Sequence, residues 1–309
     1  MALNLKELAK KEVKFTPGHR LCTGCGAAIA MRQLMLAAAD YNVAIASATC
    51  CVEISSVVYP YSSWKVSWYH NAFENAAAVA SGIEAAYKAQ KRSGKLTDDF
   101  RFIAMGGDGG TYDIGFQSLS GMAERGHRVL YVVYDNNAYM NTGIQRSGAT
   151  PLGAWTTTTH AGDAVPGKQQ TRKDLTSIMV AHGVPYVAQT AVGYWRDFMT
   201  KVQKALETDG PSFINILTPC WRGWRFDTSQ TLEVGKTAVE TYAWPLFEVE
   251  NGKYRMTYTP RVKRPASDYL KIQGRFSHLL KPGAEALAEA WQKDVDDRWE
   301  RLQKLISIS

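Results

Sequence analysis

The chain of 309 residues is long enough to bury a large core, as one α/β domain or as one domain with an appendage. Its composition, 45% hydrophobic and 21% charged, is typical of a globular protein, and no apolar run approaches the ~18 residues of a membrane span. The net charge of +7 suits nucleic acid, an acidic protein or a phosphorylated cofactor, but no nucleic-acid-binding motif accompanies it. The N-terminal stretch MALNLKELAKKEVKF mixes charges into its apolar positions, unlike a signal peptide, so we expect a cytoplasmic protein without membrane or nucleic-acid partners.

Short apolar runs alternate with longer Ala- and Leu-rich segments along the first two thirds of the chain. The short runs predict strands and the longer segments predict helices. In chain order we expect a helix at 26–39, a strand at 43–48, a helix at 73–89, a strand at 102–105, a helix at 114–124, a strand at 128–134, a helix at 174–182, a strand at 184–189, a helix at 194–207 and a strand at 212–217. Buried strands joined by helices predict an α/β fold with a doubly wound, mainly parallel sheet.

The character of the sequence changes after Trp224. Residues 225–309 show no strand–helix alternation, contain several prolines and end in a charged helix predicted at 283–306. We therefore divide the chain into a first domain at 1–224 and a C-terminal arm at 225–309. The arm is expected to pack on the core or on a neighbouring subunit.

A glycine-rich loop, MGGDGGTYDIG, follows the strand predicted at 102–105. Glycines on both sides of Asp108 let backbone N–H groups approach a ligand closely, and the helix that begins there favours anions. A carboxylate repels phosphate unless a cation lies between them, so the loop predicts a Mg²⁺-bridged diphosphate with Asp108 as an oxygen ligand. The pattern is neither a P-loop nor G-x-G-x-x-G, which argues against nucleoside triphosphates and NAD. The residues expected around the diphosphate are Gly107, Asp108, Gly109, Gly110 and Thr111.

The next predicted strand ends in YDNNAYMNTG, which supplies further oxygen atoms. The side-chain amide of Asn136 and the backbone carbonyl of Ala138 can complete a set of ligands for Mg²⁺. The 26 residues between Gly109 and Asn136 form one helix and one strand, so both loops emerge at the same edge of the sheet. Together the two loops predict one cation site.

The five cysteines leave three kinds of site open. The C-x-x-C pair in LCTGCG is compatible with zinc, a redox disulfide or an iron–sulfur cluster. A zinc ribbon needs a second such pair, and a thioredoxin-like motif leaves the other cysteines as ordinary buried thiols. Cys51 and Cys220 each follow a predicted strand and can lie beside Cys22 and Cys25, and four thiolates suffice for a [4Fe–4S] cluster. We favour the cluster over zinc, and zinc over a disulfide.

Several motifs together resemble the β subunits of the 2-oxo acid:ferredoxin oxidoreductase family, and its pyruvate branch most closely. They are CTGCG, ATCC, YPYSSWKVSWYHNAFENAAAVASGIEAA, GGDGGTYDIGFQSLSGMAERGH, YDNNAYMNTGIQRS and TPLGAWTTT, and the match runs from about His19 to Trp224. The resemblance implies a sheet of the thiamine diphosphate-binding type that holds thiamine diphosphate and Mg²⁺. It implies oxidative decarboxylation of a 2-oxo acid, with pyruvate ahead of oxalate, phenylglyoxylate and branched acids, and electron transfer to ferredoxin.

The resemblance also implies roles for individual residues. The four cluster ligands would be Cys22, Cys25, Cys51 and Cys220. The family's third ligand lies in an Ala-Thr-Gly-Cys segment, which here reads Ala-Thr-Cys-Cys, so Cys50 stands at the position of the glycine. Asn141 matches a catalytic position near the substrate carboxylate, and Thr142 beside it is expected to contact the diphosphate.

The resemblance further implies partner chains. In this family the Glu that activates thiamine lies on a partner module, and this chain has no C-x₂-C-x₂-C-x₃-C run for ferredoxin-type clusters. We therefore expect α, γ and δ-type subunits, separate or fused, that supply the pyrimidine half-site, the coenzyme A region and the outer clusters. The chain alone should be inactive. A non-redox thiamine decarboxylase with structural zinc and a basic nucleic-acid-binding protein are the alternatives that the sequence leaves open.

Overall fold

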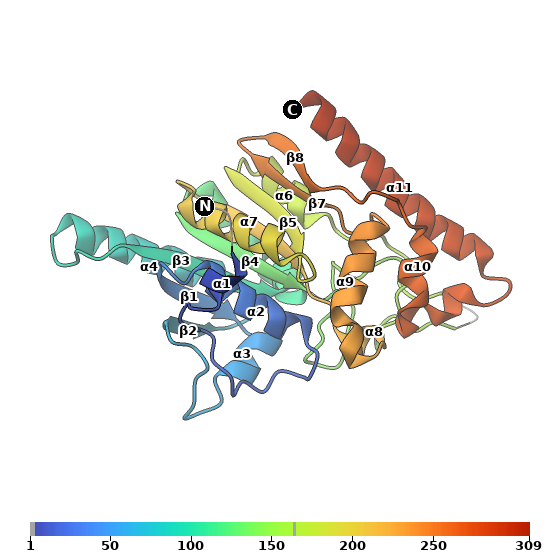
Figure 1. The fold of residues 1–309 in the computed structure, drawn as a ribbon, viewed down its shortest axis with the longest axis horizontal. Helices are drawn as coiled ribbons and strands as arrows, with labels where there is room; N and C mark the ends of the chain where they lie inside the picture. The colour runs from blue at the N-terminus through green and yellow to red at the C-terminus, as the bar shows by residue number, and fades with distance from the viewer. Residues whose placement is uncertain (1–3, 163–164) are drawn as a thin grey trace.

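The computed structural model describes residues 4–162 and 165–309, which form one eight-stranded sheet with helices on both faces (Figure 1). The strand order is β2-β1-β3-β4-β6-β5-β7-β8, in which β1 to β6 are parallel and β7 and β8 are antiparallel. This confirms the predicted α/β fold with a mainly parallel sheet. The strands are β1 (Asn42–Ala48), β2 (Ser67–Asn71), β3 (Phe100–Gly107), β4 (Val129–Asp135), β5 (Tyr186–Ala191), β6 (Ser212–Leu217), β7 (Leu246–Glu250) and β8 (Lys253–Tyr258).

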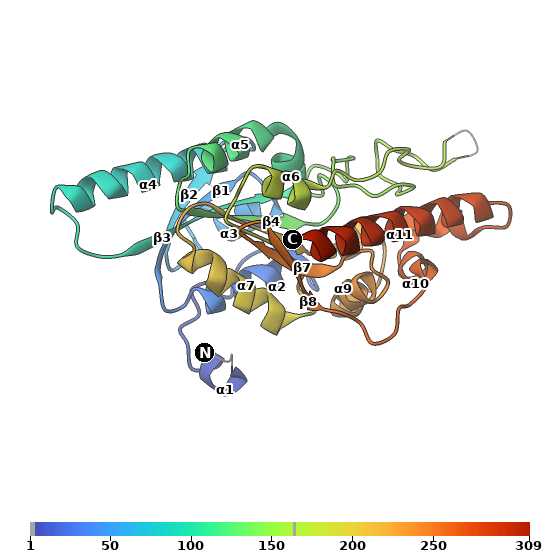
Figure 2. The same cartoon turned by 90° about the horizontal axis from the view of Figure 1, so that it is seen from above.

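Two layers of helices cover the sheet (Figure 2). Helices α2 and α7 pack on one face and α4, α5 and α6 on the other, while α9, α10 and α11 surround a third core beyond the ends of β5 and β6. The α-helices are α1 (Leu5–Leu8), α2 (Gly26–Ala37), α3 (Cys51–Ser56), α4 (Ala76–Arg92), α5 (Phe116–Glu124), α6 (Leu175–Ala181), α7 (Trp195–Glu207), α8 (Trp221–Trp224), α9 (Thr231–Glu240), α10 (Ala266–Lys271) and α11 (Glu285–Ile308). A π-helical turn, η1 (Gly110–Ile114), precedes α5, and two 3₁₀ segments are η2 (Thr228–Gln230) and η3 (Gly274–Leu280).

Each face of the sheet has its own apolar core. Alternate residues of a strand point to opposite faces, so Val132 and Ile214 pack with α2 and α7, whereas Tyr131 and Phe213 pack with α4 and α5. All residues of β4 are buried. Burial on both faces is the physical reason why the parallel strands are nearly continuous apolar runs in the sequence.

The topology opens a crevice between the carboxyl ends of β1 and β3. From β1 the chain runs through α3 to β2 on one side, then crosses back to β3 on the other side of β1. Open α/β sheets bind ligands where the strand order reverses in this way. Cys50 and Cys51 follow β1, and residues 108–110 follow β3, so both predicted motifs lie at this crevice.

The C-terminal third differs from the sequence-based expectation. Residues 225–309 contribute β7 and β8 to the antiparallel edge of the main sheet, so they are not only an arm packed on the core. The division of the chain after Trp224 stays a prediction. The final helix, predicted at 283–306, is α11 at Glu285–Ile308, and its side chains Val295 and Trp291 belong to the third core. In the described parts of the chain, no helix has both the length and the apolar character needed to cross a membrane.

Candidate functional site

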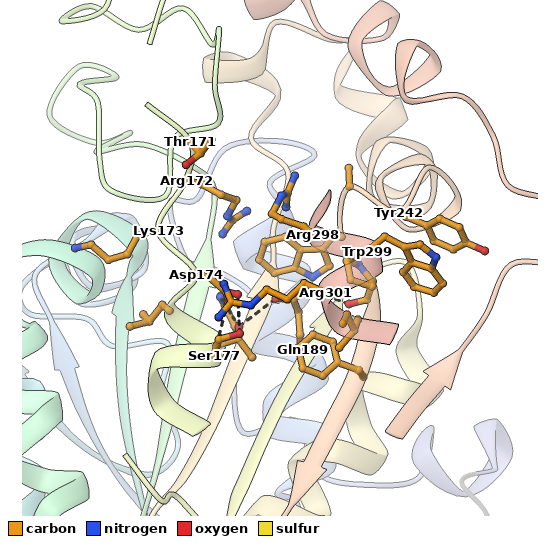
Figure 3. A pocket seen from close by; sticks show the side chains of 18 of the residues that line it. Thr171, Arg172, Lys173, Asp174, Ser177, Gln189, Tyr242, Arg298, Trp299 and Arg301 are labelled. Atoms are coloured by element: carbon orange, nitrogen blue, oxygen red, sulfur yellow. Dashed lines mark hydrogen bonds between the residues drawn. The ribbon is translucent and has the colours of Figure 1, made fainter. Parts of the chain in front are cut away.

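Two cavities border buried polar residues near the strand ends: Asp108 lines one, and Tyr112 and Arg172 line the other. A narrow one, of about 30 Å³, lies at the β1–β3 crevice, and its lining includes Cys50, Cys51, Asp108, Asn136, Ala138 and Asn141. A wider one, of about 210 Å³, lies between α6, β7 and α11 and contains none of the predicted site residues (Figure 3). The narrow cavity is therefore the candidate active site.

Three oxygen atoms meet between the loops that follow β3 and β4. The side-chain oxygen of Asn136 lies 2.9 Å from Asp108 Oδ1 and 3.0 Å from the carbonyl oxygen of Ala138, so each contact joins two acceptors. Turning the amide over would replace these contacts with hydrogen bonds, whereas a cation between the oxygens would satisfy them as they stand. Oxygen ligands about 2.1 Å from an octahedral Mg²⁺ stand about 3 Å apart, so the spacing fits the predicted cation.

Asp108 is a buried carboxylate, 1% exposed, that is held in one orientation. Its Oδ2 accepts a hydrogen bond from Ser147 Oγ at 2.5 Å, and its Oδ1 accepts one from the backbone N–H of Asn136 at 3.2 Å. Burial raises the pKa of Asp108 well above its usual range, and the charge of Asp135 raises it further. A divalent cation at Oδ1 would offset both effects, because it favours the ionised form.

Ser147→Ala is expected to weaken Mg²⁺ binding about 10–100-fold, the typical effect of losing a hydrogen bond to a metal ligand. The hydroxyl fixes Oδ2, which leaves Oδ1 directed toward Asn136 and Ala138. Mg²⁺ titration by calorimetry, with thiamine diphosphate in excess, measures the change. Ser177→Ala is a matched control, because Ser177 Oγ donates to Asp174 at 2.6 Å on an exposed helix end. Equal Mg²⁺ affinity in the two variants would show that Ser147 does not position Asp108.

The glycine loop contacts the second loop closely at Gly109. A Cβ atom at this residue would lie 2.5 Å from the ring of Tyr139, so only glycine fits there. Tyr139 also contacts Phe73, and its hydroxyl donates to Asp113 at 3.2 Å. The two aromatic rings therefore cover the backbone of the loop and limit the access of water.

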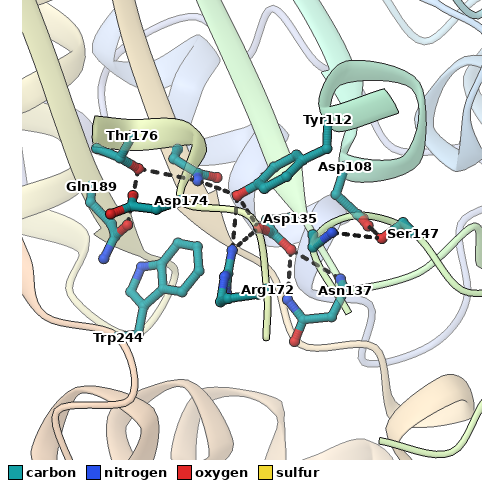
Figure 4. A network of polar contacts seen from close by, with 12 residues as sticks. Asp108, Tyr112, Asp135, Asn137, Ser147, Arg172, Asp174, Thr176, Gln189 and Trp244 are labelled. Carbon is teal, nitrogen blue, oxygen red and sulfur yellow. Dashed lines mark hydrogen bonds and ion pairs between the residues drawn. The ribbon is translucent and has the colours of Figure 1, made fainter. Parts of the chain in front are cut away.

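Beneath the two loops, Asp135 is the centre of a buried network (Figure 4). Its Oδ2 accepts from Tyr112 Oη at 2.8 Å and from Arg172 Nη2 at 2.6 Å, and its Oδ1 accepts from the backbone and side chain of Asn137 at 3.0 and 2.6 Å. Burial lowers the pKa of Arg172, but Tyr112 and Asp135 outweigh it and raise that pKa above its ordinary value. Asp135 directly precedes Asn136, so this network holds the second loop in place.

Arg172→Ala is expected to lower the free energy of unfolding by about 3–5 kcal/mol, because Asp135 then stays buried without its cation. The Arg172 side chain is 11% exposed and lies over the ring of Trp244, 4.6 Å from its centroid. Urea unfolding measures the loss. Arg196→Ala is the control, since Arg196 is exposed and lies over the ring of Trp195. A loss no larger than in the control would mean that the ion pair adds nothing to stability.

The cysteines come together from three parts of the chain. The backbone N–H of Cys25 donates to the carbonyl of Cys22 at 3.1 Å, which closes the C-x-x-C turn. The next residue, Gly26, donates to the carbonyl of Pro219 at 3.3 Å, and a Cβ there would meet that carbonyl at 2.7 Å. The glycine that follows Cys25 thus lets the turn pack against the segment that carries Cys220.

Burial and the nearness of the other cysteines raise the pKa values of these thiols. Burial raises the pKa of Cys51, and the neighbouring Cys50, Cys220, Cys25 and Cys22 raise it further. Burial also raises the pKa of Cys25, and that of Cys220 to about 11. Thiolates in such a place need cations nearby, and iron in a cluster would supply them.

Several buried polar groups have no hydrogen-bond partner in the described part of the chain, and two of them are close to a cysteine in the sequence. Among these groups are Trp221 Nε1, His19 Nδ1 and Trp68 Nε1. Trp221 directly follows Cys220, and His19 precedes Cys22 by three residues. The sulfurs of an iron–sulfur cluster accept hydrogen bonds, so this donor set fits the predicted group. Within residues 4–162 and 165–309, no three His, Cys, Asp or Glu side chains converge on a site for one metal ion.

Cys50 differs from the other cysteines in its surroundings. It is buried in the core beneath α2, and its Sγ lies 4.0 Å from Ser47 Oγ. Its φ of −174° is extended backbone, so a cysteine is accommodated at this position without strain. The side chain still reaches the lining of the narrow cavity, together with Cys51.

Some of the predicted site residues present their side chains to the narrow cavity, and others do not. Asn141 and Thr142 line the narrow cavity, and Thr142 Oγ1 donates to Gln145 at 2.5 Å. Thr111 does not present its hydroxyl to the cavity, because that hydroxyl donates to the Gly107 carbonyl at 2.8 Å. Sequence reasoning missed Ser147, Tyr112, Asp135 and Arg172. The adjacency of Asp135 to Asn136 was an available signal, whereas the loop around Ser147 carries no recognisable pattern.

Comparisons with known proteins identify the family of this chain. Residues 48–216 match the family described as thiamine pyrophosphate enzyme, C-terminal TPP binding domain. The chain is 51% identical to pyruvate synthase subunit PorB of Thermotoga maritima, over 100% of this chain and 98% of that protein. It is 53% identical to PorB of Methanocaldococcus jannaschii, over 93% and 96% of the two chains. It is also 44% identical to ketoisovalerate oxidoreductase subunit VorB of Pyrococcus abyssi, over 96% and 94%.

A solved structure shares the fold. The 2-oxoglutarate:ferredoxin oxidoreductase from Magnetococcus marinus superposes with a TM-score of 0.54 at 21% identity, covering 70% of this chain and 76% of that one. At this identity the likeness concerns the fold alone.

Proposed function

Because the chain belongs to the PorB family of thiamine pyrophosphate-dependent 2-oxo acid oxidoreductase subunits, we propose that it is the half of the enzyme that binds the diphosphate and carries the first electron acceptor. The substrate that we propose is pyruvate, and the final acceptor is ferredoxin. The observation that supports this most directly is one cavity lined by both Cys51 and Asp108. A redox centre and a diphosphate site with a common wall suit a reaction that releases electrons at the cofactor.

The residues that would hold the cofactor are those of the two loops. Asp108, Asn136 and Ala138 would bind Mg²⁺ through their oxygens, and the glycines from Gly107 to Gly110 would let backbone N–H groups reach the diphosphate. The N–H of Thr111 remains for the same purpose, since its hydroxyl is engaged. When bound, thiamine diphosphate supplies a carbanion for decarboxylation, and an iron–sulfur cluster accepts electrons one at a time.

The chain would also position the substrate and exclude water. The exposed amide of Asn141 lies in the cavity lining and can donate a hydrogen bond to the carboxylate of a 2-oxo acid. Phe73 and Tyr139 line the same cavity and cover the glycine loop. Cys22, Cys25, Cys51 and Cys220 would hold the [4Fe–4S] cluster. The pyrimidine half-site, the coenzyme A region and the outer clusters are assigned to partner subunits, and cytoplasmic location stays a prediction.

The test is anaerobic purification of the complex with its native partners, followed by viologen reduction with coenzyme A. Pyruvate is expected to give the highest kcat/KM, above 3-methyl-2-oxobutanoate, phenylglyoxylate and oxalate. The branched acid has its own support, since a ketoisovalerate oxidoreductase subunit is among the relatives. A higher kcat/KM for it would move the proposal to that substrate. Decarboxylation without dye reduction would contradict the redox function altogether.

A further inference from the structure

The wider cavity, drawn in Figure 3, shares no lining residue with the narrow cavity of the proposed active site. Its volume is about 210 Å³. Strands β5 and β6 supply Gln189 and Asn215 at the floor, Trp244 and Phe247 form an apolar wall, and α11 supplies arginines at the rim. A cavity below the ~300–1,000 Å³ of drug-sized pockets suits only a small ligand.

The floor contains an unsatisfied hydrogen-bond acceptor. Asn215 is 1% exposed, and its Oδ1 has no partner among the described residues. Its Nδ2 is engaged, since it donates to Tyr112 Oη at 2.7 Å. Burying an amide oxygen without a hydrogen-bond donor costs free energy. A ligand that donates a hydroxyl or amino hydrogen to this atom would remove that cost.

The walls and rim contain hydrogen-bond donors, the N–H groups of arginines, that have no acceptor among the described residues. Arg172 engages only Nη2, with Asp135 and Tyr112, and its Nε and Nη1 have no acceptor in the described part of the chain. Arg298 engages Nε and Nη2 with Asp294, at 3.1 and 2.9 Å. Arg301 makes no hydrogen bond or ion pair within residues 4–162 and 165–309. Three guanidinium groups therefore keep N–H donors free around one space.

The formal charge of the cavity lining also favours an anionic ligand, but it is a weaker argument than the free N–H donors. The lining includes the cations Arg172, Lys173, Arg298 and Arg301 and the acids Asp174 and Asp294, a formal excess of two positive charges (4 − 2). Asp135 and Asp113 lie behind Arg172 and Lys173 and neutralise part of that excess. The free N–H donors, rather than the net charge, select the ligand. A planar carboxylate matches the paired donors of a guanidinium group.

We infer that this cavity binds a small organic acid that carries a carboxylate together with a hydroxyl or amino group. The carboxylate contacts the free donors of Arg301 and its neighbours, and the second group donates to Asn215 Oδ1. The apolar wall of Trp244 and Phe247 holds the carbon skeleton. This site does not depend on the proposed function, because none of the predicted cofactor or cluster ligands lines it.

Calorimetry of the intact complex with L-malate and with succinate tests the inference. The two acids differ only in the hydroxyl that would donate to Asn215. Malate is expected to bind saturably, and succinate at least about tenfold more weakly, as the loss of one hydrogen bond to a buried acceptor implies. Arg301→Gln should weaken both acids about tenfold or more. Lys304→Gln removes the same charge from the same helix outside the lining, and should change neither.

Each remaining outcome counts against the inference. If neither acid binds saturably, the cavity holds only water. If malate and succinate bind equally, Asn215 is not a ligand contact. If binding is unchanged in Arg301→Gln, or weakens equally in Lys304→Gln, the acids bind elsewhere or are attracted by surface charge alone.

Discussion

Asp108→Ala is expected to abolish Mg²⁺-dependent binding of thiamine diphosphate, with a loss of affinity on the order of 100-fold or more. The variant removes the only carboxylate among the three oxygens that meet between the loops. Asn136 and the Ala138 carbonyl are neutral and would leave the charge of a divalent cation unbalanced. The measurement is the thiamine diphosphate content of the purified complex, together with calorimetric titration of Mg²⁺.

Two further variants separate charge from structure at this position. Asp108→Asn keeps the shape and the acceptor for Ser147 but removes the charge, so it should lose most of the Mg²⁺ affinity as well. Asp98→Ala removes an exposed carboxylate from the loop before β3 and should behave like the unaltered protein. Unchanged cofactor content in Asp108→Ala would remove Asp108 from the site.

Cys220→Ser is expected to remove most of the cluster iron, whereas Cys50→Ser should retain most of it. Four thiolates hold one [4Fe–4S] cluster, and loss of one of them typically destabilises it. Cys220 lies just after β6, in the segment that packs against the C-x-x-C turn, while Cys50 is buried in the core with its Sγ 4.0 Å from Ser47 Oγ. Iron and sulfide analysis of the separated chain, with absorption near ~400 nm, measures the difference.

The pair of cysteine variants also distinguishes the alternatives. The opposite pattern, with iron lost in Cys50→Ser and kept in a Cys51→Ser variant, would exchange the roles of the two residues. Zinc in place of iron in the unaltered chain would make the cysteines structural. It would also remove the electron acceptor from the proposed function.

The fold was predictable where a strand is buried on both faces. The strands β1, β3, β4 and β6 are mostly apolar, and the prediction located each of them within a few residues. The edge strand β2 was missed because most of its residues are exposed, and it has no apolar run. The antiparallel strands β7 and β8 were also missed. One reason is that β8 is largely exposed and polar. A sheet edge covered on one side only gives a weaker signal in the sequence.

The site residues that could be predicted have a local sequence signal, and those that could not are placed by contacts between distant parts of the chain. Asp108 and Asn136 were predictable because each directly follows a buried strand, and parallel strands end at one edge. Ser147 and Arg172 were not, because each contacts its partner across more than thirty residues of loop and helix. Nothing in the local sequence distinguishes a serine that orients a carboxylate from a serine in a turn. Such contacts depend on the path of the loops, which periodicity does not determine.

The distribution of the cysteines along the chain has a consequence for assembly. Cys22 and Cys220 are separated by 198 positions, and the contact between their segments exists only once β1 and β6 have their places in the sheet. A nascent or unfolded chain would therefore present a C-x-x-C pair without its other two ligands. The iron of the proposed cluster would enter last, into a chain already folded, and would then link the start of α2 to the segment that follows β6. Loss of the proposed cluster would remove that link, while the hydrogen bonds that pair the strands of the central sheet would remain.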